Sequence, residues 1–226
     1  MTTQPVTIST LHREALTRRV RWLVTATIGY NVVEAVVALG AGVVASSTAL
    51  LGFGLDSLVE VSSAAALAWQ FSARDHDHRQ ARERTALHVT AVSFFALAAF
   101  VTLEAIRTLA GSTTPEHSRV GIALAAVSLV VMPVLSVTQR RTGRQLGSAS
   151  AVADSKQTLL CTYLSGVLLL GLIANAALGW SWADPIAGLV IAVVAVREGR
   201  DAWRGDTCCG ADVEPQALSD RSSDTN

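Results

Sequence analysis

Six long apolar stretches constrain what this 226-residue chain can fold into. They cover residues 22–44, 49–71, 86–109, 120–137, 149–178 and 183–196. An α-helix needs about 20 apolar residues to cross the hydrocarbon core of a bilayer, and the last stretch is short for a full span. Charged residues make up 16% of the chain, whereas soluble globular domains carry about 25%. We therefore predict an all-α integral membrane bundle of six transmembrane helices.

The arginines predict how these helices are oriented. Seventeen of the 18 basic residues are arginine, and they gather before the first stretch and after the second, fourth and sixth. Because cytoplasmic loops collect Lys and Arg, six spans with both termini cytoplasmic satisfy every loop, whereas five spans would leave the basic tail outside. The predicted organisation is a cytoplasmic N-terminal segment at 1–20, a transmembrane domain at 21–204 and a polar, disordered cytoplasmic tail at 205–226.

Composition narrows the remaining function classes. Eighteen acidic residues balance the 18 basic ones, which removes the electrostatic case for binding nucleic acid. A chain rich in Arg, Ala and Val and poor in Lys is typical of a GC-rich bacterium, which favours the plasma membrane as its location. Three cysteines cannot form a disulfide scaffold, and the sequence assigns no specific role to the adjacent pair Cys208 and Cys209.

Two carboxylates interrupt the second apolar stretch. Asp56 and Glu60 lie four residues apart, so both project from one face of a helix. A charged side chain at the centre of the bilayer costs about 2.5 to 3.5 kcal/mol by insertion scales. Because of this cost, an acidic residue there is a candidate for a functional site. Two close carboxylates repel, and Lys156 is the only Lys or Arg at comparable depth, so a metal ion or exchangeable protons are favoured. The alternative is that protonated carboxyl groups hydrogen-bond a neighbouring helix.

The fifth stretch offers the other half of a metal site. Helical spacing places a stripe of polar side chains on one face: Asp154, Gln157 or Thr158, and Cys161. Together with Asp56 and Glu60, these oxygen and sulfur ligands are suited to enclosing a divalent ion. The alternative is an interfacial pair between Asp154 and Lys156, with Cys161 acting as a small hydrophobic residue.

Three ordered motifs resemble those of the cation diffusion facilitator transporters. Residues 47–60, STALLGFGLDSLVE, resemble the second span of that family, which reads S-x-A-L-L-A-D-A-x, then His or Asp, then three residues and Asp. Residues 153–161, ADSKQTLLC, are similar to its fifth span, A-D-A-x-H-x-x-x-D. Residues 182–185, WADP, fall where the family begins its sixth span with W-x-D-P. The resemblance covers most of residues 20–204.

The resemblance implies which residues form the transport site. In the family, this site is built from two four-apart pairs on spans two and five. Asp56 and Glu60 match the first pair, and Gln157 and Cys161 match the second. Glu60 stands where the family has Asp, Gln157 where it has His, and Cys161 where it has Asp. Because Gln is a weak neutral ligand, Asp154 is the alternative residue to complete the shell.

The resemblance also implies the function. The family exports Zn²⁺ and related divalent ions from the cytoplasm, usually as proton-coupled homodimers, so we expect a transporter with no enzymatic activity and no resident cofactor. A thiolate favours soft or borderline ions, and Zn²⁺ is our choice over Cd²⁺, Co²⁺ or Fe²⁺. Binding must displace protons, which predicts proton antiport with alternating access. The family's cytoplasmic C-terminal domain has no counterpart after residue 204, which resembles the short branch of the family. The alternative is a non-transporting assembly partner whose carboxylates only mediate helix association.

Other residues are secondary candidates. Asn31 and Glu34 lie on one face of the first stretch and either line the ion path or hydrogen-bond a partner helix. Glu104 and Arg107 are expected to form an interfacial pair. The loop after the second stretch alternates acid and histidine, which makes four residues a candidate auxiliary metal site: Asp75, His76, Asp77 and His78. Small residues predict close helix packing at four glycines: Gly40, Gly42, Gly166 and Gly171.

Overall fold

A computed structural model describes residues 10–71, 76–146 and 149–204, although some side chains within these ranges lie outside the description. Six helices account for nearly all of the described chain: α1 Thr10–Ala45, α2 Thr48–Phe71, α3 His76–Leu109, α4 Arg119–Leu146, α5 Ala149–Leu178 and α6 Ala183–Arg204. The described residues include no strand. The prediction of an all-α six-helix bundle is therefore confirmed.

Several helices extend beyond the apolar stretches that predicted them. The first helix begins at Thr10, twelve residues before the apolar stretch, and α4 and α6 continue through their arginines to residues 146 and 204. The predicted loop at 74–79 is wrong from His76 onward, because the backbone of α3 is helical from that residue. The segment 76–86 contains no Gly or Pro and several good helix formers, so a helix continues there after the apolar part ends.

Four helices contain segments that are long and apolar enough to cross a membrane. These segments are Trp22–Ala45 in α1, Leu87–Leu109 in α3, Arg119–Gln145 in α4 and Thr158–Leu178 in α5. The described parts of α2 and α6 do not meet that criterion. Asp56 and Glu60 interrupt the apolar sequence of α2, although the helix itself is continuous. The apolar part of α6 is short, as its sequence predicted.

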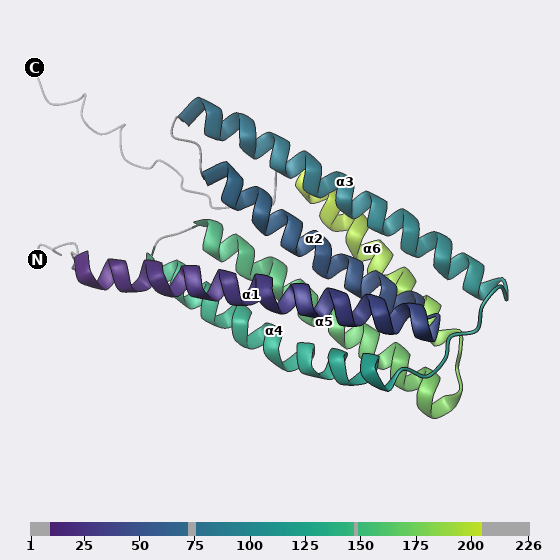
Figure 1. Cartoon of the computed structure of the whole chain (residues 1–226). Coiled ribbons are helices and arrows are strands. Elements are labelled where there is room, and N and C mark those ends of the chain that lie inside the picture. Colours follow the sequence, from purple (N-terminus) through teal and green to yellow (C-terminus); the bar gives the residue numbers. More distant parts are fainter. Residues whose placement is uncertain (1–9, 72–75, 147–148, 205–226) are drawn as a thin grey trace, which may run out of the picture.

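Figure 1 shows how the six helices are arranged. Successive helices run in opposite directions, with α1, α4 and α5 on one side of the bundle and α2, α3 and α6 on the other. Helix α2 packs against α1, α3, α5 and α6, which makes it the most enclosed of the six. The beginning of α1 and the end of α6 lie toward the same end of the bundle, as an even number of spans requires.

The bundle has a packed interior and an apolar outer surface. The main core cluster joins α1, α2, α4, α5 and α6 through buried residues that include Leu50, Phe53, Met132, Leu168 and Ile191. A second cluster joins α2 to α3 and α6 through residues that include Val59, Phe94, Leu97 and Val101. Large apolar side chains also point outward: Val36, Val44, Val130, Leu170 and Val193. An apolar outer face is what a bundle immersed in lipid requires.

Several glycines allow neighbouring helices to approach closely. A Cβ atom at Gly54 would lie 3.0 Å from the backbone nitrogen of Leu39 on α1, and one at Gly171 would lie 2.8 Å from Cβ of Ala187 on α6. The prediction for Gly171 is therefore confirmed, as is that for Gly42, where a Cβ would lie 3.0 Å from Leu51. The prediction for Gly40 is wrong, because nothing lies within 4 Å of its Cβ position.

A Cβ atom at Gly166 would make only an ordinary contact of 3.8 Å with Leu129. The prediction of close packing at Gly166 is therefore wrong as well. Close packing depends on which face of the helix a glycine occupies, and the residue type alone does not specify that face.

The start of α2 is fixed by α6. The hydroxyl group of Ser47 accepts a hydrogen bond from the backbone N–H of Leu50, at 3.2 Å, and so caps the helix. The fully buried carboxyl group of Asp184 accepts hydrogen bonds from the Ser47 hydroxyl, at 2.5 Å, and from the N–H of Ala49, at 3.3 Å. The WADP segment therefore anchors the first turn of α2.

We predict that Gly54→Ala destabilises the bundle by about 1 to 3 kcal/mol, because its new methyl group meets the α1 backbone, which cannot move aside as a flexible side chain would. The matched control is Gly40→Ala, where the methyl group meets open space and helix propensity favours alanine. Thermal unfolding of both variants in detergent checks this. Equal midpoints for the two variants would contradict the close approach of α1 and α2.

Candidate metal centre

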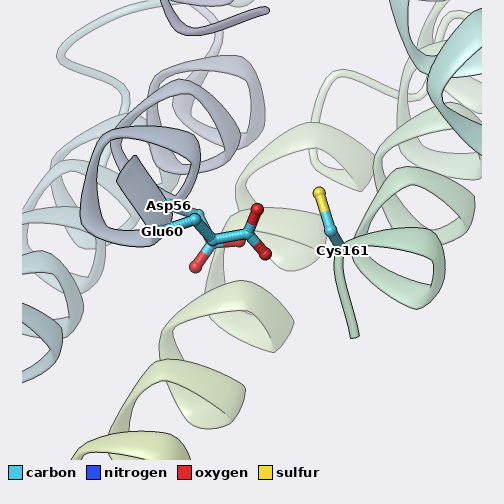
Figure 2. A group of neighbouring side chains, drawn as sticks. All are labelled: Asp56, Glu60 and Cys161. Carbon is cyan, nitrogen blue, oxygen red and sulfur yellow. The ribbon is translucent and has the colours of Figure 1, made fainter. Parts of the chain in front are cut away.

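Three buried side chains with metal-ligand chemistry meet between α2 and α5. Asp56, Glu60 and Cys161 each offer one ligand atom, and these three atoms lie within 4.8 Å of one another. Figure 2 shows the two carboxylates extending from α2 toward Cys161 on the opposite helix. The thiol is fully buried, and the carboxylates are 5% and 7% exposed. We call these residues the three-residue site.

The local structure of α2 explains the position of the acidic pair. Asp56 and Glu60 are separated by one helical turn, so they project from the same face. That face points inward because α2 packs on α1, α3, α5 and α6. Cys161 faces the pair from α5, where Leu164 and Leu168 continue the same buried face.

The donor set suits a four-coordinate ion. Tetrahedral Zn²⁺ with bonds of about 2.0 to 2.3 Å keeps its ligand atoms about 3.3 to 3.6 Å apart. The three donor atoms lie within 4.8 Å of one another, which approaches this spacing. Two carboxylates and one thiolate would supply three of the four ligands of such an ion. Each binds the ion in its deprotonated form.

A further buried carboxyl group, Glu34 on α1, joins four helices next to this site. It accepts hydrogen bonds from Ser57 on α2, at 2.8 Å, and from Ser128 on α4. The thiol of Cys161 on α5 also donates to Glu34, with 3.8 Å between Sγ and Oε2. Tyr30 bonds Ser128 at 2.8 Å and extends the network. Of the two predicted roles for Glu34, the structure supports hydrogen bonding to partner helices.

Asn31, the other predicted α1 residue, contacts the three-residue site directly. Its side-chain Nδ2 donates a hydrogen bond of 2.6 Å to Oε2 of Glu60. Asn31 also lines a pocket between α1, α2 and α5, together with Val24, Thr27, Ile28, Glu60, Ala64 and Thr158. Its place in the structure is therefore compatible with both predicted roles. Asn31 hydrogen-bonds a neighbouring helix, and it lies beside a pocket that could form part of an ion path.

Several predicted ligands lie outside the described part of the structure. Asp154 and Gln157 belong to the helical backbone of α5, but their side chains are not described, so the choice between them stays a prediction. The same holds for the side chains of His76, Asp77 and His78, and for the whole of Asp75. Cys208 and Cys209 are also outside the described residues.

The sequence interpretation missed two polar residues on α4. Ser128 bonds Glu34, and Gln139 bridges two helices by donating to Thr27 on α1, at 3.0 Å, and accepting from Thr158 on α5, at 3.2 Å. These residues are eleven positions apart, which is about three helical turns, so both lie on one face. A search for periodic polar residues along the fourth apolar stretch and the helical turn that follows it would have found this face.

Two acidic residues lie on the carboxyl-terminal part of α6, and one is near the site. Glu198 is half-buried and within electrostatic range of Asp56. Burial raises the pKa of Glu198, as does the negative charge of Asp201, while Arg197 lowers it. Glu104 on α3 pairs with Arg107, with 2.9 Å between Oε1 and NH1, which confirms the predicted pair.

Ionisable side chains buried inside a membrane bundle commonly mark an ion or substrate site. The family model described as the cation efflux transmembrane domain matches residues 24–204. The chain therefore belongs to the cation efflux family, the cation diffusion facilitator transporters that its motifs resemble. The members of this family are membrane cation transporters, and the family is generally non-enzymatic.

Three relatives illustrate the similarity. An uncharacterized transporter of Synechocystis is 24% identical over 158 residues, or 67% of this chain and 51% of that protein. Protein p34 of Rickettsia prowazekii is 27% identical over 165 residues, or 70% and 54% of the two chains. Transmembrane protein 163 of Xenopus laevis is 22% identical over 183 residues, or 80% and 65%. The chain thus matches between half and two thirds of the length of these relatives.

We predict that the full chain in detergent binds Co²⁺ with a thiolate-to-metal charge-transfer band, because Cys161 is a sulfur donor beside two carboxylates. The experiment uses a Cys208→Ser, Cys209→Ser background, so that Cys161 is the only thiol. Cys161→Ser should abolish the band, and Asp56→Asn should weaken Co²⁺ binding about tenfold or more. A band that persists in Cys161→Ser would exclude this cysteine as a ligand.

Proposed function

We propose that this chain exports a divalent metal ion from the cytoplasm, with Zn²⁺ as the preferred substrate, by proton antiport and alternating access. One observation carries the proposal: two carboxylates and a thiol with ligand atoms within 4.8 Å of one another, buried inside a bundle of membrane-spanning length. Isolated charges are costly there, and a divalent cation offsets that cost.

The ligand types favour Zn²⁺ or Cd²⁺ over harder ions. Mg²⁺ demands six oxygen ligands in octahedral geometry and keeps much of its water. A site with one thiolate and two carboxylates instead suits ions that accept sulfur and tetrahedral geometry. The replacement of a family aspartate by Cys161 therefore shifts the site toward softer ions.

Proton coupling follows from competition for the same atoms. Asp56, Glu60 and Cys161 each bind either a proton or the metal, so metal binding releases protons and protonation expels the metal. An inward proton gradient would then reload the carboxylates from outside and drive export. The mechanism requires only that the site opens alternately to the two sides of the membrane.

The packing around the site supports alternating access. The pocket that reaches Glu60 is lined on α1 by Val24, Thr27, Ile28 and Asn31, and from Asn31 it extends toward the end of α1 that the arginine pattern assigns to the cytoplasmic side. On the opposite side of Asp56, the interior is filled by buried side chains: Leu50, Phe53, Leu164 and Leu168. We infer a cytoplasm-facing state from this arrangement, and we propose that the transporter acts as a homodimer in the plasma membrane.

A second candidate function rests on the Glu34 network. Glu34 joins α1 to α2, α4 and α5 through hydrogen bonds, which is how intramembrane carboxyl groups act when they hold helices together. A non-transporting assembly partner would need no more than this. It would show normal cellular metal content when Asp56 is replaced, together with weaker assembly.

We predict gradient-dependent Zn²⁺ flux into proteoliposomes that are acidic inside and loaded with a Zn²⁺-sensitive dye. Asp56→Asn and Glu60→Gln should reduce the flux to the background of empty vesicles, because each removes a charged ligand. The matched control is Glu104→Gln, since this carboxylate pairs with Arg107 away from the site and should leave the flux unchanged. No flux for Zn²⁺, Cd²⁺, Co²⁺, Fe²⁺ or Mn²⁺ would sink the transporter proposal and favour the assembly partner.

The thiol gives a separate prediction about ion preference. Cys161→Ser replaces a soft sulfur by a harder oxygen of similar size, so the ratio of Cd²⁺ to Zn²⁺ flux should fall by about tenfold. Measuring both ions in the same vesicles removes differences in protein content. An unchanged ratio in a variant that still transports Zn²⁺ would show that the cysteine does not contact the ion.

A further inference from the structure

The pocket beside the three-residue site has a polar lining of its own. Seven residues line it, contributed by α1, α2 and α5: Val24, Thr27, Ile28, Asn31, Glu60, Ala64 and Thr158. Glu60 is the one member of the three-residue site among them, while Asp56 and Cys161 do not line the pocket. The pocket is therefore adjacent to the site and distinct from it, with one carboxylate in common.

The pocket extends from Glu60 toward the arginine-rich end of the bundle. On α2, Ala64 lies one turn beyond Glu60 in that direction, and on α5, Thr158 lies about one turn before Cys161. On α1, Val24 precedes Asn31 by seven residues, which is about 10 Å along the helix axis. All three walls thus place the pocket on the predicted cytoplasmic side of the three-residue site.

Asn31 has an unpaired acceptor at the inner end of this pocket. Asn31 is only 2% exposed. Its Nδ2 donates to Glu60, but its Oδ1 atom is buried and accepts no hydrogen bond. A buried polar atom without a partner costs about 1 to 3 kcal/mol, and such atoms normally satisfy their bonding with a group, water or ion. This carbonyl oxygen is therefore available to a ligand.

The neighbouring hydroxyl groups hold the pocket walls in place. Gln139 on α4 donates to Thr27 on α1 and accepts from Thr158 on α5, so one amide bridges two walls. Thr27 also donates to the backbone oxygen of Leu23, at 3.0 Å. Because these hydroxyls already bond Gln139 and the Leu23 backbone, Asn31 Oδ1 and the Glu60 carboxylate are the ligand atoms best placed to receive an incoming cation.

We propose that this pocket is an access site for the divalent cation, in which Asn31 Oδ1 and the carboxylate of Glu60 bind the ion before it reaches the three-residue site. The proposal rests on the proposed function, since it concerns the same substrate. An amide carbonyl oxygen is a hard, neutral ligand that replaces water without losing a proton. The ion then moves inward by exchanging Asn31 and water for Asp56 and Cys161 while Glu60 stays bound.

A purely positioning role for Asn31 makes a different prediction. In that case only the Nδ2 group matters, because it donates to Glu60 and orients this carboxylate. Asn31→Asp separates the two roles. This variant keeps an oxygen ligand and adds charge, which helps an access site, but it replaces the donor by a group that repels Glu60, which harms a positioning role.

The test is the rate at which Co²⁺ reaches Cys161, measured by stopped flow as the appearance of the thiolate band. It uses the full chain in detergent, in the Cys208→Ser, Cys209→Ser background. We expect Asn31→Leu to slow the rate by about 10- to 100-fold while the final band stays within twofold of the parent chain. Asn31→Asp should bind at least as fast as the parent chain. Asn175→Leu is the matched control, since this buried asparagine bonds the Pro115 carbonyl oxygen instead, and its rate should not change.

The outcomes separate this proposal from the function on which it rests. Parent-like rates in Asn31→Leu would overturn the access site and leave the three-residue site standing. Should Asn31→Leu fail to fold, Asn31→Asp decides alone, because slow binding in that variant would assign Asn31 to positioning Glu60. A parent chain without any thiolate band would overturn the three-residue site, and the access site with it.

Discussion

The interior of this protein is organised around two carboxylates that lie where a membrane bundle can least easily accommodate them. Asp56 and Glu60 sit on one turn of α2, both nearly buried, in a chain whose outer surface is apolar. Such groups need protons, hydrogen-bond donors or a cation around them. The polar groups at the centre of the bundle meet this need: Asn31 bonds Glu60, and the thiol of Cys161 faces the pair. Placing these groups requires α2 to be enclosed by four other helices.

The enclosure of α2 depends on contacts far from the carboxylates. Asp184 on α6 binds the first turn of α2 through Ser47 and Ala49, which fixes the helix at its outer end. Gly54 lets α1 approach within contact of α2 just before the acidic pair, which brings α1 beside the site. The α1 residues that bond the centre, Asn31 and Glu34, depend on that approach. The close packing of α1 on α2 at Gly54 thus helps to position the α1 side chains beside the three-residue site.

The centre combines a rigid network with an accessible carboxylate. Glu34 receives hydrogen bonds from α2, α4 and α5, so it connects four helices and limits their relative movement. Glu60 faces the pocket, and its α1 partner, Asn31, retains an unpaired oxygen. A transporter must hold its ion site together and also let the ion reach it. Under the proposed function, the first requirement falls on Glu34 and the second on Glu60.

The sequence by itself determined the six-helix membrane architecture, because apolar length and arginine placement are local properties of the chain. It also determined that Asp56 and Glu60 share a face, since helical spacing fixes that without any tertiary contact. Only the tertiary structure decided that Cys161 lies against this pair, that Glu34 bonds Ser128, and that Gly54 packs on α1 while Gly40 faces outward. Each of these depends on how helices distant in sequence rotate and cross, which spacing along one helix does not specify.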